Sequence, residues 1–193
     1  MKKLTRNDLL PLERYAAERK DFRATVLAHK QNRHLSLGPN AALLFEDRTT
    51  VQYQVQEMLR IERIFEADAI QEELDAYNPL IPDGGNLKAT LMFEYPDPAV
   101  RAERLNQLGE IEHRVYAEVD GQQRIFAHAD EDLGRSTEHK TSAVHFLRFE
   151  FSASEIAALR AGAALAFGID DPRLPVRAAA EGATRQALLA DFD

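Results

Sequence analysis

The sequence predicts a single α+β domain over residues 1–193, in which a mainly antiparallel sheet of hairpins packs against amphipathic helices. Two observations predict this class. Short apolar segments with a period of two occur between longer segments whose apolar residues recur every three or four positions. Turn signals such as Asp120-Gly121 join strand-like segments directly, as in antiparallel hairpins. The chain has no internal repeat or evident linker, so one core is expected.

The first expected element is a basic amphipathic helix over residues 8–31. Asp8 suits an N-cap and Pro11 suits a first helical turn, and Tyr15, Phe22 and Val26 follow at helical spacing. Residues 1–34 hold nine Lys and Arg against four acids, whereas the complete chain has a net charge of −8. The helix is therefore expected either to pack against the acidic body of its own fold or to form an arm with a patch for an anionic partner.

Two short strands, "HLSLGPN" and "ALLFE", follow and are separated at Gly38-Pro39. The next stretch, "RTTVQYQVQEMLRIERI" (48–64), fits two periods. Val51, Tyr53 and Val55 alternate with glutamines as in a strand, but a helix over about 50–66 gathers the apolar residues on one arc and has a capping box at Thr49. We predict the helix, and treat the glutamine alternation as coincidental.

In that helix Glu62 falls near the middle of the apolar arc. A buried carboxylate is costly unless it is paired or coordinated, so Glu62 is expected in a buried salt bridge, in a backbone cap, or in a metal or catalytic site.

The remaining elements follow from the same two periods and from turn residues. Asp97-Pro98 and the capping box of Ser152 with Glu155 mark helix starts. The expected elements are helices over 66–77, 97–108, 153–161 and 183–190, strands over 87–96, 110–119, 123–129, 143–151, 164–169 and 175–180, and a polar surface loop over 130–142.

Composition excludes several classes of function. The chain has no cysteine, which rules out disulfides, thiolate nucleophiles and self-held iron–sulfur clusters. The net negative charge argues against nucleic acid as the main partner. No apolar run is long enough to span a membrane, and no signal peptide is evident, so a cytoplasmic location without membrane association is expected. Nucleotide-binding glycine loops and nucleophile elbows are also missing.

A metal site is the sharpest chemical hypothesis. If the turn lies at Asp120-Gly121, His113 and His128 face each other across a hairpin, and with Glu62 they could bind Fe, Mn, Zn or Ni. Ordinary surface or half-buried histidines are the alternative. Glu110 and His113 also match the Glu-x-x-His spacing of di-iron bundles, but that motif needs a helix, and the alternation here predicts a strand.

The segments "LLFEDRTTVQYQVQEMLRIERI" and "IQEELDAYNPLIP" resemble a bacterial domain-of-unknown-function family of roughly 200 residues. "KLTRNDLLPLERY", "SAVHFLRFEF" and "FGIDDP" are similar to it too. Members are often encoded near rubrerythrin-like and iron–sulfur oxidoreductase genes, and the resemblance therefore implies a role near iron or peroxide metabolism. It assigns no functional residues.

The leading hypothesis is an accessory or binding protein that acts through a protein partner, or as a homo-oligomer, in redox or iron-related stress. A His/carboxylate metal-binding protein or metal-dependent enzyme is the second hypothesis. A small-molecule-binding module with a pocket between the helices and the sheet is the third. Whether the chain is an enzyme is left open by the sequence.

Overall fold

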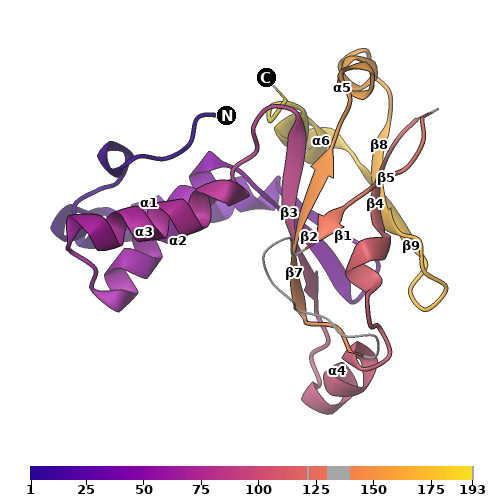
Figure 1. Ribbon diagram of the computed structural model, residues 1–193, viewed down its shortest axis with the longest axis horizontal. Coiled ribbons are helices and arrows are strands. Elements are labelled where there is room, and N and C mark those ends of the chain that lie inside the picture. Colours follow the sequence, from indigo (N-terminus) through magenta and orange to yellow (C-terminus); the bar gives the residue numbers. More distant parts are fainter. Residues whose placement is uncertain (121, 130–139, 193) are drawn as a thin grey trace.

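The structure, a computed structural model, describes residues 1–120, 122–129 and 140–192. Within them the helices are α1 (Leu12–Gln31), α2 (Arg48–Glu62), α3 (Ala67–Tyr77), α4 (Pro98–Leu105), α5 (Ala153–Arg160) and α6 (Gly182–Leu189). Short 3-10 helices are η1 (Arg6–Asp8), η2 (Asn78–Leu80) and η3 (Ile111–Arg114). Figure 1 shows α1, α2 and α3 grouped on one side of the molecule, with the strands and α4, α5 and α6 on the other.

The described strands form two sheets. The larger sheet has the order β1 (His34–Ser36), β2 (Ala41–Glu46), β3 (Asn86–Phe93), β7 (Val144–Glu150) and β6 (His128–Ala129). The smaller sheet has the order β5 (Ile125–Phe126), β4 (Val115–Val119), β8 (Leu165–Ile169) and β9 (Val176–Ala180). All pairs are antiparallel, which confirms the predicted α+β class, although the strands are divided between two sheets.

The main core lies between the two sheets. The rings of Phe45 on β2 and Phe149 on β7 lie 4.8 Å and 5.3 Å from the ring of Phe167 on β8, centroid to centroid. All three side chains are buried. Such tilted and edge-on aromatic contacts add to the free energy gained from burying apolar surface.

One short segment, residues 125–129, belongs to both sheets. In β5, Phe126 lies opposite Tyr116 of β4, whereas in β6, His128 lies opposite Arg148 of β7. Between them the buried Ala127 donates its N–H to the carbonyl of Val115 at 2.9 Å. The two sheets are therefore joined along this edge.

The basic helix begins at Leu12, not at residue 8. Asp8 ends the short helix η1, and Pro11 has an extended ψ of 144°, so the chain between them runs straight before α1 starts. The expected packing of this helix against the acidic body is seen at two arginines. Arg19 pairs with Glu57 at 2.7 Å, and Arg33, just beyond the helix, pairs with Asp191 at 2.8 Å.

The helical prediction for residues 48–64 is confirmed for Arg48–Glu62. The carboxylate of Asp47 accepts the N–H of Thr50 at 2.8 Å and caps the start of α2. Val51, Val55 and Leu59 are buried in a second, smaller apolar cluster that joins the N-terminal segment, α2 and α3. Their helical spacing places the three side chains on one face of α2, and their burial stabilises this side of the molecule.

The predicted burial of Glu62 is wrong. Arg63 adopts the left-handed conformation, with φ of 54°, so α2 ends at Glu62 instead of continuing to residue 66. The apolar arc extends past the core, and Ile61 and Phe65 are 58% and 66% exposed. Glu62 is itself exposed to solvent, and its charge therefore needs no buried partner.

Candidate binding site

Two glutamines of α2 hold the N-terminal segment against that helix. The buried Gln56 accepts the N–H of Leu10 at 2.5 Å and donates to the carbonyl of Leu10 at 3.3 Å. Gln52, one helical turn earlier, donates to the carbonyl of Asp8 at 2.6 Å. Because buried backbone groups need hydrogen-bond partners, these contacts fix the path of residues 8–10. Gln52 and Gln56 lie four residues apart and therefore share a helix face. The prediction that the alternation of glutamines is coincidental missed their common role in holding the N-terminal segment.

The start of the chain is held in a similar way. Asn78 accepts the N–H of Leu4 at 2.8 Å and donates to its carbonyl at 2.9 Å. Asp8 accepts the N–H of Thr5 at 2.8 Å and pairs with Arg48 at 2.5 Å. The hydrogen bond from the Thr5 backbone contributes most to lowering the pKa of Asp8 to about 2, and the contact with Arg48 lowers it further. The short helix η1 therefore has a fixed position over α2 and α3.

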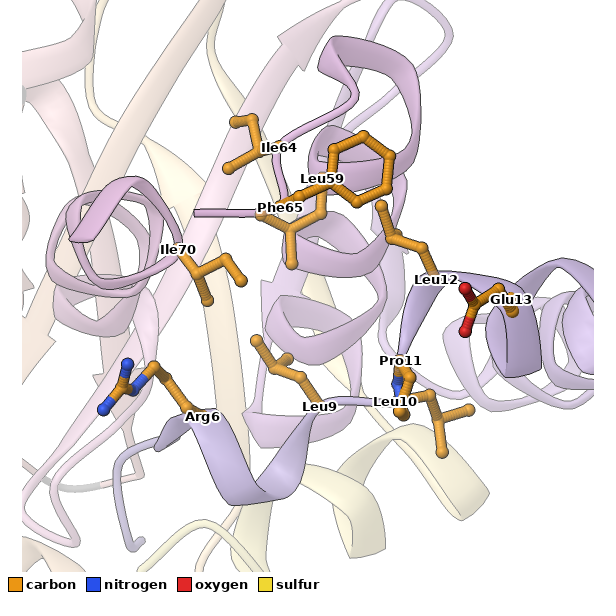
Figure 2. Close-up of a pocket in the computed structure, with 10 residues that line it drawn as sticks. All are labelled: Arg6, Leu9, Leu10, Pro11, Leu12, Glu13, Leu59, Ile64, Phe65 and Ile70. Atoms are coloured by element: carbon orange, nitrogen blue, oxygen red, sulfur yellow. The ribbon is translucent and has the colours of Figure 1, made fainter. Parts of the chain in front are cut away.

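An apolar hollow lies between this segment, the start of α1, the end of α2 and the start of α3 (Figure 2). Its volume is about 310 Å³. Its hydrocarbon lining comes mainly from Leu9, Leu10, Leu12, Leu59, Ile64, Phe65 and Ile70. These side chains come from segments far apart in the sequence, so the hollow exists only in the folded chain.

Two opposite charges flank the lining. Figure 2 shows Arg6, from η1, and Glu13, from the first turn of α1, on opposite sides of the apolar side chains. Both residues are exposed, and within the described part of the chain neither side chain has a hydrogen bond or an ion pair. A guanidinium and a carboxylate thus remain available to a bound molecule.

Phe65 makes the hollow a surface feature. The left-handed turn at Arg63 directs the chain away from α2 and leaves the Phe65 side chain 66% exposed at the edge of the hollow. Large exposed apolar side chains beside a concave apolar surface are typical of binding sites. The lining combines apolar side chains with the charges of Arg6 and Glu13, and it could therefore bind a molecule that carries both apolar and charged groups.

The structure corrects the hairpin that was predicted to pair His113 with His128. Glu110 has a φ of 60° and opens η3, so His113 lies in a 3-10 turn and the strand starts only at Val115. Phe126 faces Tyr116, one residue away from the predicted register. His128 belongs to the other sheet. Gly121, half of the predicted turn, lies outside the described residues.

The three proposed metal ligands lie on separate elements. Glu62 ends α2 on the helical side of the molecule, whereas His113 in η3 and His128 in β6 adjoin the sheets, and all three are exposed. Over residues 1–120, 122–129 and 140–192, no group of three or more His, Cys, Asp or Glu side chains is arranged to hold a metal ion. Metal binding by these residues stays a prediction.

A buried polar cluster was missed by sequence reasoning. Thr141 donates its hydroxyl to Glu112 at 3.1 Å and lies 2.6 Å from Nε2 of His145. All three residues are 2% exposed or less. The cluster forms where η3 meets the start of β7. No local sequence pattern predicts this cluster, because Glu112 was expected on a strand and Thr141 in a surface loop.

The family follows from comparison with known proteins. A family model described as "Protein of unknown function (DUF3501)" matches residues 3–192. The chain belongs to the DUF3501 family. The expected membership of a domain-of-unknown-function family is thereby confirmed.

One solved structure extends this comparison. The DUF3501 chain is similar to a novel protein of unknown function from Burkholderia pseudomallei K96243, whose crystal structure was determined at 1.90 Å resolution. The two share 50% sequence identity over 100% of each chain, with a TM-score of 0.93. No curated protein matches the chain. The comparisons establish family and fold, and their descriptions name no activity.

Within the described residues of the DUF3501 chain, no helix has both the length and the apolar character that crossing a bilayer requires.

Proposed function

We propose that this DUF3501 chain is an accessory binding protein that docks an apolar segment of a partner protein in the hollow. The observation that carries the proposal is Phe65, which is 66% exposed at the edge of a hydrocarbon-lined hollow. A few apolar side chains seated in pockets supply most of the free energy of protein–protein binding. Covering Phe65 and filling the hollow would remove this exposed surface from water.

The construction of the hollow supports docking without large rearrangement. Gln52 and Gln56 hold residues 8–10 against α2, and Asn78 holds Leu4. A site whose backbone is already fixed loses less conformational entropy when it binds. The hollow is therefore suited to a segment that adapts to it.

The size and openness of the hollow favour a protein segment over a small molecule. Small-molecule sites usually enclose most of their ligand and span about 300–1,000 Å³. This hollow, of about 310 Å³, is at the lower end of that range and is open beside Phe65. It also lies among the helices and the N-terminal segment, away from the helix–sheet position expected for a small-molecule module.

The proposed setting is redox or iron-related stress in a bacterial cytoplasm. Its support is the gene neighbourhood implied by the family resemblance, which includes rubrerythrin-like and iron–sulfur oxidoreductase genes. The chain has no cysteine and cannot hold a cluster by itself, so it would act through a partner.

Site-specific photo-crosslinking in the native cells tests the proposal. A photoreactive phenylalanine analogue at position 65 is expected to give a discrete protein adduct, which mass spectrometry assigns to a redox or iron protein. The matched control is the same analogue at Leu27, which is 44% exposed. Leu27 lies on α1 about four turns beyond Leu12, a residue of that helix that lines the hollow. Equal labelling at both positions would contradict docking in the hollow.

Two further measurements separate the alternatives. A thermal-shift screen with small apolar compounds tests the small-molecule module, which would show a rise in unfolding temperature that Phe65→Ser abolishes. Metal analysis of the purified chain after exposure to Fe, Mn, Zn and Ni tests the metal-binding alternative, and a stoichiometric ion would support it.

A further inference from the structure

We infer that the segment bound in the hollow carries an acidic residue beside Arg6 and a basic residue beside Glu13, so that the two charges fix its direction. This inference rests on the proposed docking function and adds the polarity of the bound segment. It follows from the placement of two unpaired charges on opposite sides of one apolar surface.

Arg6 differs in its contacts from two other arginines of the N-terminal region. Arg14 pairs with Glu18, and Arg19 pairs with Glu57, so their charges are already met within the chain. The Arg6 side chain has no such partner among the described residues, although it lines the hollow. Guanidinium groups bind carboxylates with two parallel hydrogen bonds, which gives direction as well as affinity.

Glu13 provides the opposite charge. It lies in the first turn of α1, where the helix dipole favours a negative side chain, and it lines the hollow without a partner in the described structure. A Lys or Arg on the bound segment would meet this carboxylate. In the reversed orientation, the acidic residue of the segment would lie beside Glu13 and its basic residue beside Arg6. Both contacts would be repulsive.

The two charges also distinguish a peptide segment from other occupants. An apolar anion such as a fatty acid would use Arg6 and would gain nothing from Glu13. A segment of protein can carry both charges at the two ends of an apolar stretch. The paired signs of Arg6 and Glu13 therefore favour the protein segment.

Selection from a random peptide library displayed on phage, with the full chain as bait, tests this inference. The enriched peptides are expected to place apolar residues between an acidic and a basic residue in one constant order. The double variant Arg6→Glu/Glu13→Arg is expected to enrich the opposite order. A reversal of charge order is a result that a merely structural role of these residues would not produce.

Affinity measurements with a selected peptide give the magnitudes. By fluorescence anisotropy, Arg6→Glu and Glu13→Arg are each expected to weaken binding about tenfold or more, and Phe65→Ser at least as much. Lys20→Glu and Asp21→Arg change charge on the exposed face of α1 and are expected to leave the affinity unchanged. Circular dichroism melting verifies that each variant is folded.

The outcomes separate the two proposals. If Phe65→Ser abolishes binding while Arg6→Glu and Glu13→Arg leave both affinity and charge order unchanged, the charge inference fails and docking stands. If no peptide is enriched, or binding ignores Phe65→Ser, docking of a protein segment in the hollow fails as well. A dimer of the free chain that dissociates on Phe65→Ser would show instead that a second copy occupies the hollow.

Discussion

Glu57 shows how a single carboxylate on α2 neutralises part of the basic α1. It accepts two hydrogen bonds from the Arg19 guanidinium, at 2.8 Å and 2.7 Å, and one from the Tyr15 hydroxyl at 2.6 Å. The Arg19 hydrogen bonds contribute most to lowering the pKa of Glu57 from its usual 4.5 to about 2. Burial, followed by the hydrogen bond to Glu57, raises the pKa of the Tyr15 hydroxyl. The positive charge of Arg19 is therefore neutralised within the fold and does not form part of an anion-binding site.

The lowered pKa of Glu57 predicts a pH-dependent contribution to stability. Because the carboxylate is more acidic in the folded state, its stabilisation is complete above about pH 4.5 and is lost as the pH falls towards about 2. We expect Glu57→Gln to lower the free energy of unfolding by about 1–2 kcal/mol at pH 7, with allowance for solvent screening. Urea unfolding of both proteins should show this difference shrinking between pH 4.5 and 2. A difference that is constant with pH would contradict this assignment.

At the scale of elements, the approach of β8 to its neighbours depends on Gly168. It lies opposite Tyr116 of β4, and a Cβ atom at this position would come within 2.5 Å of the Tyr116 hydroxyl and 2.6 Å of the Val176 carbonyl. The second contact is with backbone, which cannot rotate away. The smaller sheet therefore needs glycine here for packing and not for an unusual φ.

We expect Gly168→Ala to destabilise the chain by about 1–3 kcal/mol, because the strands must separate to admit the methyl group. Thermal and urea unfolding measure the change. Gly85→Ala is a matched control, since the nearest atom to its Cβ would be the Asp83 carboxylate at 3.7 Å, an ordinary contact. Equal stabilities for the two variants would show that the sheet adjusts without cost.

At the scale of the whole molecule, two apolar clusters are connected by polar contacts. The cluster between the sheets is large, whereas the helical cluster has six buried members among the described residues, which are Leu4, Val51, Val55, Leu59, Leu74 and Ile81. Arg33 links the two sides, because it pairs with Asp47 at the start of α2 and with Asp191 near the C-terminus, at 2.9 Å and 2.8 Å. The helical side is thus expected to open at a lower free energy than the sheets.

Leu74→Ala tests this difference in stability. Leu74 is fully buried in the helical cluster, and its truncation should cost about 2–5 kcal/mol locally. Hydrogen exchange measured by mass spectrometry should show a larger loss of protection in α1, α2 and α3 than in β3 and β7. A uniform loss over all of these elements would mean that both clusters unfold as one unit.

Much of the fold could be predicted because it depends on local patterns. The helical spacing of Val51, Val55 and Leu59 predicted α2 against a competing strand pattern, and Asp97-Pro98 predicted the start of α4. The strands β2, β7, β8 and β9 likewise lie within a residue or two of their predicted ranges, whereas β4 starts at Val115 instead of at residue 110. Periodicity and caps act over a few residues, so the sequence contains them in full.

The expected surroundings of the candidate site residues depended on contacts between distant segments, and two of those expectations differ from the structure. Glu62 follows the apolar period of α2, but the core ends one turn earlier, and no local pattern records where a core ends. The pairing of His113 with His128 required an unbroken hairpin, which the turn at Glu110 and the crossing at Ala127 prevent.

The sequence by itself determined the class, the family likeness and the positions of most helices and strands, because short-range periods and capping residues encode them. Only the tertiary structure decided that Gln52 and Gln56 hold the N-terminal segment, and that Arg6, Glu13 and Phe65 meet around one hollow. The physical reason is that a binding surface forms from side chains brought together by packing, and their proximity is a property of the folded chain.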